Sequence, residues 1–116
     1  MYDQLRFDYL SCYGHKHLHT PNFDRVAARG VRFTNAYVQS PVCGSSRMST
    51  YTGRYSSSHG AGWNKFPLRI GEITLGDHLR ENGMECWLLG KTHMVADEEG
   101  MARLGIDKNS VIGVRQ

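Results

Sequence analysis

Residues 43–53, Cys-Gly-Ser-Ser-Arg-Met-Ser-Thr-Tyr-Thr-Gly, decide how the rest of this chain is interpreted. A proline two positions upstream and the small residues after Cys43 favour a loop around the cysteine, and residues 45–52 are predicted to form a helix that ends at Gly53. The cysteine then lies at a helix N-terminus, where unpaired backbone N–H groups and the helix dipole favour an anion. Arg47, one turn further on, offers a planar guanidinium for a sulfate or phosphate group. The stretch therefore predicts an anion site with a reactive sulfur in it.

The same residues resemble the signature of type I sulfatases and of the related phosphonate monoester hydrolases, Cys-x-Pro-Ser-Arg-x-x-x-x-Thr-Gly. In that family a formylglycine-generating enzyme oxidises the cysteine to formylglycine, whose hydrated aldehyde is the nucleophile. The resemblance implies that one hydroxyl of the hydrated residue 43 attacks the sulfur or phosphorus of a small anionic ester. The second hydroxyl then lets the covalent ester collapse back to the aldehyde. Ser45 departs from the signature, because the family usually has proline at this position, which the modifying enzyme reads.

Cys43 has three other interpretations. A cysteine near an arginine is usually a buried small hydrophobic residue beside an unrelated surface charge. A cysteine-dependent phosphatase loop fits poorly, since that loop needs five residues between its Cys and Arg and this chain has three. A thiol-dependent enzyme predicts that Cys43 reacts unusually fast with alkylating agents near neutral pH.

Asp3 and Gln4, near the start of the sequence, are candidate metal ligands. In the alkaline phosphatase superfamily an acidic residue at the end of the first strand binds a divalent metal, and the branch that resembles phosphonate monoester hydrolases has Asp-Gln there. A carboxylate and an amide carbonyl are hard oxygen donors, so the resemblance implies one Ca²⁺, Mg²⁺ or Mn²⁺ ion. The alternative is an ordinary solvated segment.

Residues 90–93, Gly-Lys-Thr-His, resemble the Gly-Lys-x-His segment of the same family. The resemblance implies that Lys91 places a positive charge beside the developing negative oxygen, and that His93 hydrogen-bonds the diol or assists its collapse. The family commonly has Trp at the third position, and Thr92 in its place indicates the branch that resembles phosphonate monoester hydrolases. Asn64 resembles by position an active-site asparagine that donates an amide hydrogen bond to the substrate. The alternative for residues 91–93 is an exposed turn.

Helices and buried strands are predicted to alternate along the chain. Residues 20–30 have the punctuation of a helix, with Thr20 as its cap and Gly30 at its end, and the alternation of residues 31–38 is typical of a half-buried strand. A second helix is expected over residues 73–82 and a second strand over residues 84–90. This order predicts an α/β layered fold, and with the resemblance it indicates the N-terminal part of an alkaline-phosphatase-like sheet with helices. Residues 97–116 have no decisive pattern and read as loop or weak helix.

The remaining histidines and both tryptophans are expected to be structural. His15, His17 and His19 would share one face of a strand and could mimic a zinc site. A polar loop that leads into the following helix explains them more simply. His59 and His78 are expected to be structural or surface residues, and Trp63 and Trp87 to belong to the core.

Composition limits the remaining possibilities. The 116 residues make about one small domain, and a net charge of +3 suits a small anionic substrate, while the absence of a Lys/Arg run argues against nucleic acid. The odd count of three cysteines without paired spacing argues against a disulfide scaffold and favours a reducing, cytoplasmic location. No stretch is long and apolar enough to span a membrane, and no leader is visible.

Residues 1–116 are therefore expected to form a partial sulfatase-like catalytic domain. Family members are several times longer, and a downstream Asp-His or Asp-Asn pair that completes the metal site cannot be placed in this sequence. The isolated chain is predicted to have little or no activity, because two metal ligands bind weakly. The alternative is a non-catalytic remnant that binds anions or a partner. The oligomeric state stays open, with a homo-oligomer of the full-length enzyme retained as one option.

Overall fold

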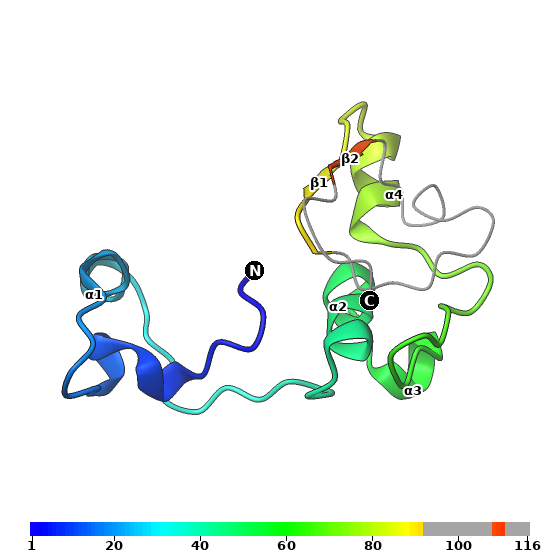
Figure 1. Cartoon of the computed structure of the whole chain (residues 1–116). Coiled ribbons are helices and arrows are strands. Elements are labelled where there is room, and N and C mark those ends of the chain that lie inside the picture. The colour runs from blue at the N-terminus through cyan, green and yellow to red at the C-terminus, as the bar shows by residue number, and fades with distance from the viewer. Residues whose placement is uncertain (92–107, 111–116) are drawn as a thin grey trace. The chain divides into compact units, whose positions relative to one another are not determined.

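The computed structural model describes residues 1–91 and the backbone of residues 108–110. The chain divides into two compact units, an N-terminal unit of Met1–Tyr37 and a C-terminal unit of Val38–Gln116. The N-terminal unit contains two short 3-10 helices and one α-helix, and the described residues of the C-terminal unit contain three α-helices and a pair of strands (Figure 1). No helix in the described part of the chain is long and apolar enough to cross a membrane.

The N-terminal unit packs helix α1 (Pro21–Arg29) against the 3-10 helices η1 (Phe7–Tyr9) and η2 (Ser11–Tyr13). The predicted helix of residues 20–30 is confirmed, but its cap works differently from the prediction, since Thr20 makes no side-chain cap. The Thr20 hydroxyl instead accepts the backbone N–H of Ser11 at 3.0 Å, and the Ser11 hydroxyl donates to the Asp24 carboxylate at 2.7 Å. These contacts fix the loop that precedes α1.

The predicted strand of residues 31–38 is wrong. These residues form no strand, and Val31 and Phe33 are 79% and 66% exposed. A strand needs a neighbouring strand for its backbone hydrogen bonds, and the N-terminal unit contains none. The Phe33 carbonyl accepts instead from the hydroxyl of Tyr13 at 2.8 Å. An alternating pattern of apolar and polar residues is therefore not sufficient to predict a strand.

The C-terminal unit is built around helix α2 (Cys43–Thr52), which begins two residues earlier than predicted. Cys43 is thus the first helical residue instead of a loop residue, and the Val42 carbonyl accepts the N–H of Ser46 at 2.8 Å. The helix ends as predicted at Gly53, whose φ of 67° lies in the left-handed region that glycine adopts without strain. Helix α3 (Ser56–His59) follows at once and packs against α2.

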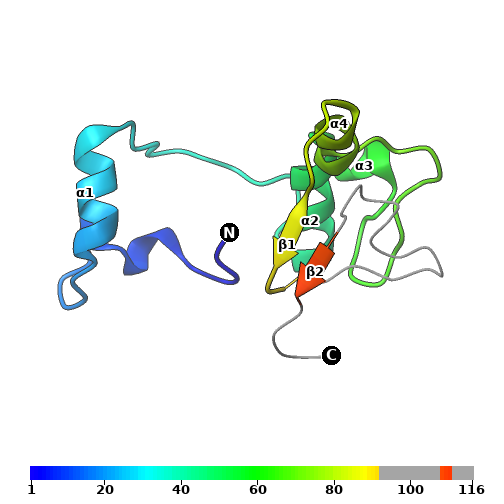
Figure 2. The same cartoon turned by 90° about the horizontal axis from the view of Figure 1, so that it is seen from above.

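Helix α4 (Leu75–Glu81) and strand β1 (Trp87–Leu89) complete the described part of this unit. Thr74 and Asp77 form a capping box that starts α4, so the helix is shorter than the predicted residues 73–82. β1 pairs in parallel with β2 (Lys108–Ser110) (Figure 2). In this pairing Leu88 lies opposite Asn109. The sequence of β2 is polar, so no apolar pattern predicted this strand. The loop or weak helix expected at residues 97–104 lies outside the described residues.

The core of the C-terminal unit contains Met48 from α2 together with Ala61 and Leu68. Tyr51, Cys86 and Leu88 pack against this cluster. The prediction that both tryptophans belong to the core is wrong, because Trp63 and Trp87 are each 59% exposed. In β1 it is Leu88 that packs against the core, and successive strand residues point to opposite faces, so Trp87 points away.

Candidate active site at the start of helix α2

Cys43 occupies the first turn of a helix, as the anion-site prediction requires. It is half-buried, and the residue before it, Val42, is extended and provides no side-chain cap. The N–H groups of the first helical turn have no partner within the helix, so they give this end a partial positive charge. A negatively charged group beside Cys43 would therefore be stabilised.

Asn64 reaches this helix end from outside the helix. Its side-chain oxygen Oδ1 accepts the backbone N–H of Gly44 at 2.8 Å, and its Nδ2 group donates toward the Cys43 sulfur at 3.7 Å. The two partners fix the orientation of the amide, because only the oxygen can accept from an N–H group. The structure thus brings Asn64 and Cys43 together although they lie 21 positions apart in the sequence. One amide holds the helix start and also contacts the residue 43 side chain.

Arg47 links α2 to the end of strand β1. Its side chain is buried, with 6% of the residue exposed, and Nη1 donates to the backbone carbonyl of Lys91 at 2.6 Å. Lys91 follows Gly90, whose φ of 94° turns the chain sharply at the end of β1. The sequence predicted Arg47 as an anion ligand, and the structure adds a contact that joins α2 to Lys91 of the predicted Gly-Lys-Thr-His segment.

The remaining predicted site residues fall into two groups. Thr92 and His93 lie outside the described residues, so only Lys91 of their segment is placed. Asp3 and Gln4 are exposed residues of the N-terminal unit, and Gln4 has a positive φ of 58°. Two adjacent hard oxygen donors fit a Mg²⁺-like or Ca²⁺-like ion but fill only part of its shell of six to eight ligands. Among the described residues no group of three or more His, Cys, Asp or Glu side chains could hold a metal ion.

Ser45 is a feature of the site that sequence reasoning treated only as a departure from a signature. Its side chain lies in the first turn of α2 with 0% exposure, and its hydroxyl oxygen has no hydrogen-bond partner among the described residues. A buried hydroxyl without a partner costs free energy, so this position suits an apolar side chain better than serine. No signal in the sequence reveals the burial, because the neighbouring residues are small and polar.

His59 is a second feature that the sequence analysis left without a specific role. It is fully buried, and its ring contacts the Ser49 hydroxyl of α2 and the backbone N–H of Ala61. Burial lowers the pKa of His59, because a charged imidazolium loses its hydration there. The expectation of a structural or surface residue is thus resolved as structural, whereas the His78 side chain is 65% exposed.

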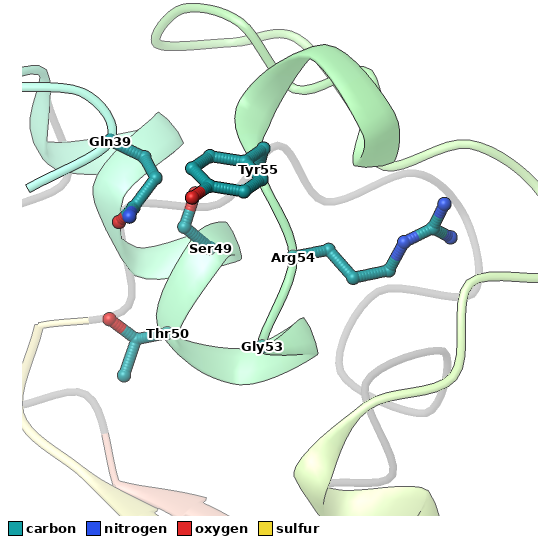
Figure 3. Close-up of a pocket in the computed structure, with 6 residues that line it drawn as sticks. All are labelled: Gln39, Ser49, Thr50, Gly53, Arg54 and Tyr55. Carbon is teal, nitrogen blue, oxygen red and sulfur yellow. The ribbon is translucent and has the colours of Figure 1, made fainter.

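A pocket of about 380 Å³ lies along the second half of α2, where Cys43 and Asn64 do not line it (Figure 3). Its lining residues are Gln39, Ser49, Thr50, Gly53, Arg54 and Tyr55. Several of its polar groups are already engaged: Ser49 contacts His59, Thr50 donates to the Ser46 carbonyl, and Arg54 binds the Glu72 carboxylate. These polar side chains already bind other residues of the chain, so the pocket is a weaker candidate for a reactive site than the start of α2. The candidate site therefore remains at Cys43.

Two curated relatives illustrate which proteins the chain is similar to. It is 36% identical over 92 residues to an ulvan-active sulfatase of Formosa agariphila, and these matched residues make up 79% of this chain and 18% of the relative. It is 37% identical over 105 residues to human steryl-sulfatase, and this match covers 81% of this chain and 18% of the relative. The chain spans 16 to 20% of the length of such relatives.

A solved structure and a family model complete the comparison. The crystal structure of the phosphonate monoester hydrolase of Agrobacterium radiobacter matches with a TM-score of 0.80 and 30% identity, covering 96% of this chain and 24% of that one. This match confirms the predicted fold, the N-terminal part of an alkaline-phosphatase-like α/β domain. The family model for sulfatases matches residues 1–113. The chain therefore belongs to the sulfatase family, within the alkaline phosphatase superfamily.

Proposed function

We propose that this chain carries the nucleophile of a hydrolase that cleaves sulfate, phosphonate or phosphate esters. The observation that supports this most is the pair of contacts from Asn64, which hold the start of α2 and the side chain of Cys43 together. A nucleophile needs a fixed position beside the group that it attacks, and a helix N-terminus provides one that favours an anion. Membership of the sulfatase family supports the same class of reaction.

Residue 43 is proposed to act as formylglycine. After conversion by a formylglycine-generating enzyme, one hydroxyl of its hydrated aldehyde attacks the sulfur or phosphorus of the ester and displaces the alcohol. The second hydroxyl then loses its proton, so that the aldehyde re-forms and the sulfate, phosphonate or phosphate group leaves. The Asn64 Nδ2 group, now directed at sulfur, is placed to donate to an oxygen on residue 43 or to an oxygen of the bound anion. The partly positive helix start stabilises the negative charge that develops during the attack.

Arg47 and Lys91 are proposed to serve the transferring group. Arg47 contributes a planar guanidinium, and its contact with the Lys91 carbonyl holds the backbone that presents the Lys91 side chain. The ammonium group of that side chain places a positive charge beside the developing negative oxygens. Thr92 and His93 are proposed to continue the same surface, with Thr92 in substrate binding and His93 in proton transfer.

Asp3 and Gln4 are proposed to hold part of the shell of one divalent metal, Ca²⁺, Mg²⁺ or Mn²⁺. Such an ion polarises the ester and neutralises part of its charge. Because the chain spans about a fifth of its relatives' length, the other ligands are proposed to come from the rest of the whole protein. The 116-residue chain by itself is then expected to turn over little substrate.

The first experiment is mass spectrometry of the peptide that contains residue 43, after production of the chain with a formylglycine-generating enzyme. The proposal expects replacement of the thiol by an aldehyde, and hydrolysis of an aryl sulfate or aryl phosphonate by the whole protein with metal. Cys43→Ala is the control that removes the nucleophile. The matched variant Ser45→Pro restores the family signature. If aldehyde forms at residue 43 in this variant and not in the natural chain, Ser45 is the residue that prevents the conversion.

The second candidate function is a non-catalytic remnant that binds an anion or a partner. The observation that favours it is Ser45, which departs from the signature that the modifying enzyme reads. An unmodified thiol in both the natural chain and the Ser45→Pro variant, with no turnover by the whole protein, would favour this candidate over the hydrolase.

A further inference from the structure

His59 contacts three segments of the C-terminal unit, two through its imidazole ring and one through its backbone carbonyl. Its Nε2 atom lies 2.9 Å from the hydroxyl oxygen of Ser49 on α2, a residue drawn in Figure 3. Its Nδ1 atom accepts the backbone N–H of Ala61 at 3.1 Å, in the turn after α3. The backbone carbonyl of His59 accepts the backbone N–H of Arg69 at 3.0 Å. With 0% exposure, the residue lies wholly inside the unit.

These contacts fix both the tautomer and the charge of His59. A ring nitrogen that accepts a backbone N–H cannot itself carry a proton, so Nδ1 is bare. The proton of the neutral ring is therefore on Nε2, which donates to the Ser49 hydroxyl. A second proton on Nδ1 would face the Ala61 N–H, donor against donor.

The charged groups around His59 do not offset the cost of a second proton. Glu72 favours the imidazolium, but both of its carboxylate oxygens contact Nη1 of Arg54, at 2.7 and 2.8 Å. Arg54 and Arg69 both disfavour a further positive charge, and burial has the largest effect. Charge and geometry thus agree that His59 is neutral while the unit is packed.

We infer that His59 is a positioning residue for the helix that carries residue 43, and that it holds this helix only while it is neutral with its proton on Nε2. Protonation of Nδ1 forces the ring or the turn at Ala61 to move, because two N–H donors then face each other and neither can accept a hydrogen bond. Ala61 belongs to the same buried cluster as Met48 of α2, so the movement loosens the packing of α2. This deepens the proposed function, in which residue 43 is the nucleophile, by adding an acid-sensitive support.

The thiols of the chain provide a test that does not depend on catalysis. Cys86 packs against the cluster of Met48, Ala61 and Leu68, whereas Cys12 belongs to the N-terminal unit. Alkylation of each thiol in the 116-residue chain is followed by peptide mass spectrometry between about pH 7.5 and pH 5, across the ordinary histidine pKa. Each rate is divided by the rate of the same thiol in urea, which removes the intrinsic effect of pH.

The normalised rate of Cys86 relative to Cys12 is expected to rise as the pH falls below about 6.5, by up to tenfold per pH unit for one coupled proton. His59→Gln offers a neutral amide that does not titrate, so its ratio is expected to be the same at every pH. His78→Gln, at an exposed histidine, is expected to follow the natural chain. A ratio that stays flat in the natural chain, or that rises equally in His59→Gln, would overturn the inference.

Nitrogen-15 NMR of the histidine ring keeps the test decisive if His59→Gln does not fold. The inference expects a proton on Nε2 of His59 near pH 7.5 and none on Nδ1. A proton on Nδ1 there would overturn it. If the alkylation and NMR results are as expected but Cys43 is not converted to the aldehyde, the proposed function is contradicted and the inference about His59 is not.

Discussion

Replacement of Asn64 by alanine and by aspartate separates its two contacts at the start of α2. Asn64→Ala removes the acceptor of the Gly44 N–H, which is a 2.8 Å hydrogen bond to a helix N-terminus. Losing a side-chain cap of this kind typically costs about 1 kcal/mol, in a range of about 0.5–2. Asn64→Asp keeps an acceptor at this place and adds a negative charge at the positive helix end, worth about 0.3–1 kcal/mol. The aspartate variant is therefore expected to be about 1–2 kcal/mol more stable than the alanine variant.

Tryptophan fluorescence during urea unfolding measures this difference, since Trp63 and Trp87 both lie in the C-terminal unit. Gln39→Ala, which removes an exposed amide from the same unit, is the control and is expected to change stability by less than about 0.5 kcal/mol. In the whole protein, Asn64→Asp is expected to slow hydrolysis by at least about tenfold, because a carboxylate repels the anionic ester. Equal destabilisation by alanine and aspartate would refute the contact between Oδ1 and Gly44 as a support of the helix.

Three further perturbations follow from the same unit. Ser45→Ala is expected to stabilise the chain by about 1 kcal/mol in urea unfolding, because it removes a buried hydroxyl that has no partner among the described residues; a clear loss of stability would mean that the hydroxyl is satisfied. Arg47→Met is expected to cost about 1–3 kcal/mol by leaving the Lys91 carbonyl without this donor, whereas Arg80→Met, at a side chain that is 48% exposed, is expected to cost far less. The lowered pKa of His59 means that the unfolded chain takes up its proton first on acidification, so the urea midpoint is expected to be highest above about pH 7 and to fall as the pH drops through about 6.5. A midpoint that is constant over this range would contradict the assignment.

Local signals in the sequence identified the helices better than the strands. The residue types at both ends of residues 20–30 predicted the bounds of α1, although Thr20 makes no side-chain cap, because such signals concern only the nearest turn of the chain. The alternation of residues 31–38 predicted a strand that does not form, since pairing requires a partner strand that the pattern does not specify. β2 shows the converse, as Lys108–Ser110 forms a strand through its partner β1 and without an apolar pattern of its own.

The sequence could place two candidate site residues on one element where both belong to a motif of a few residues. Cys43 and Arg47 lie on one helix, so their spacing alone indicates a shared site. The hydrogen bond from Arg47 to the Lys91 carbonyl joins segments that are 44 residues apart, and no local pattern encodes it. The burial of Ser45 and His59 is likewise a property of tertiary packing, which single-sequence reasoning does not reach.

The position of residue 43 depends on contacts that are distributed over the whole length of α2. The first turn of a helix frays readily, because its N–H groups lack partners within the helix. Asn64 secures that turn at Gly44, Arg47 ties the next turn to the end of β1, and Ser49 is held by His59. Because Ser49 and residue 43 lie on the same helix, we expect that loosening the Ser49 contact makes the position of residue 43 less precise. The reactivity of the site is therefore expected to respond to substitutions two turns away from the nucleophile.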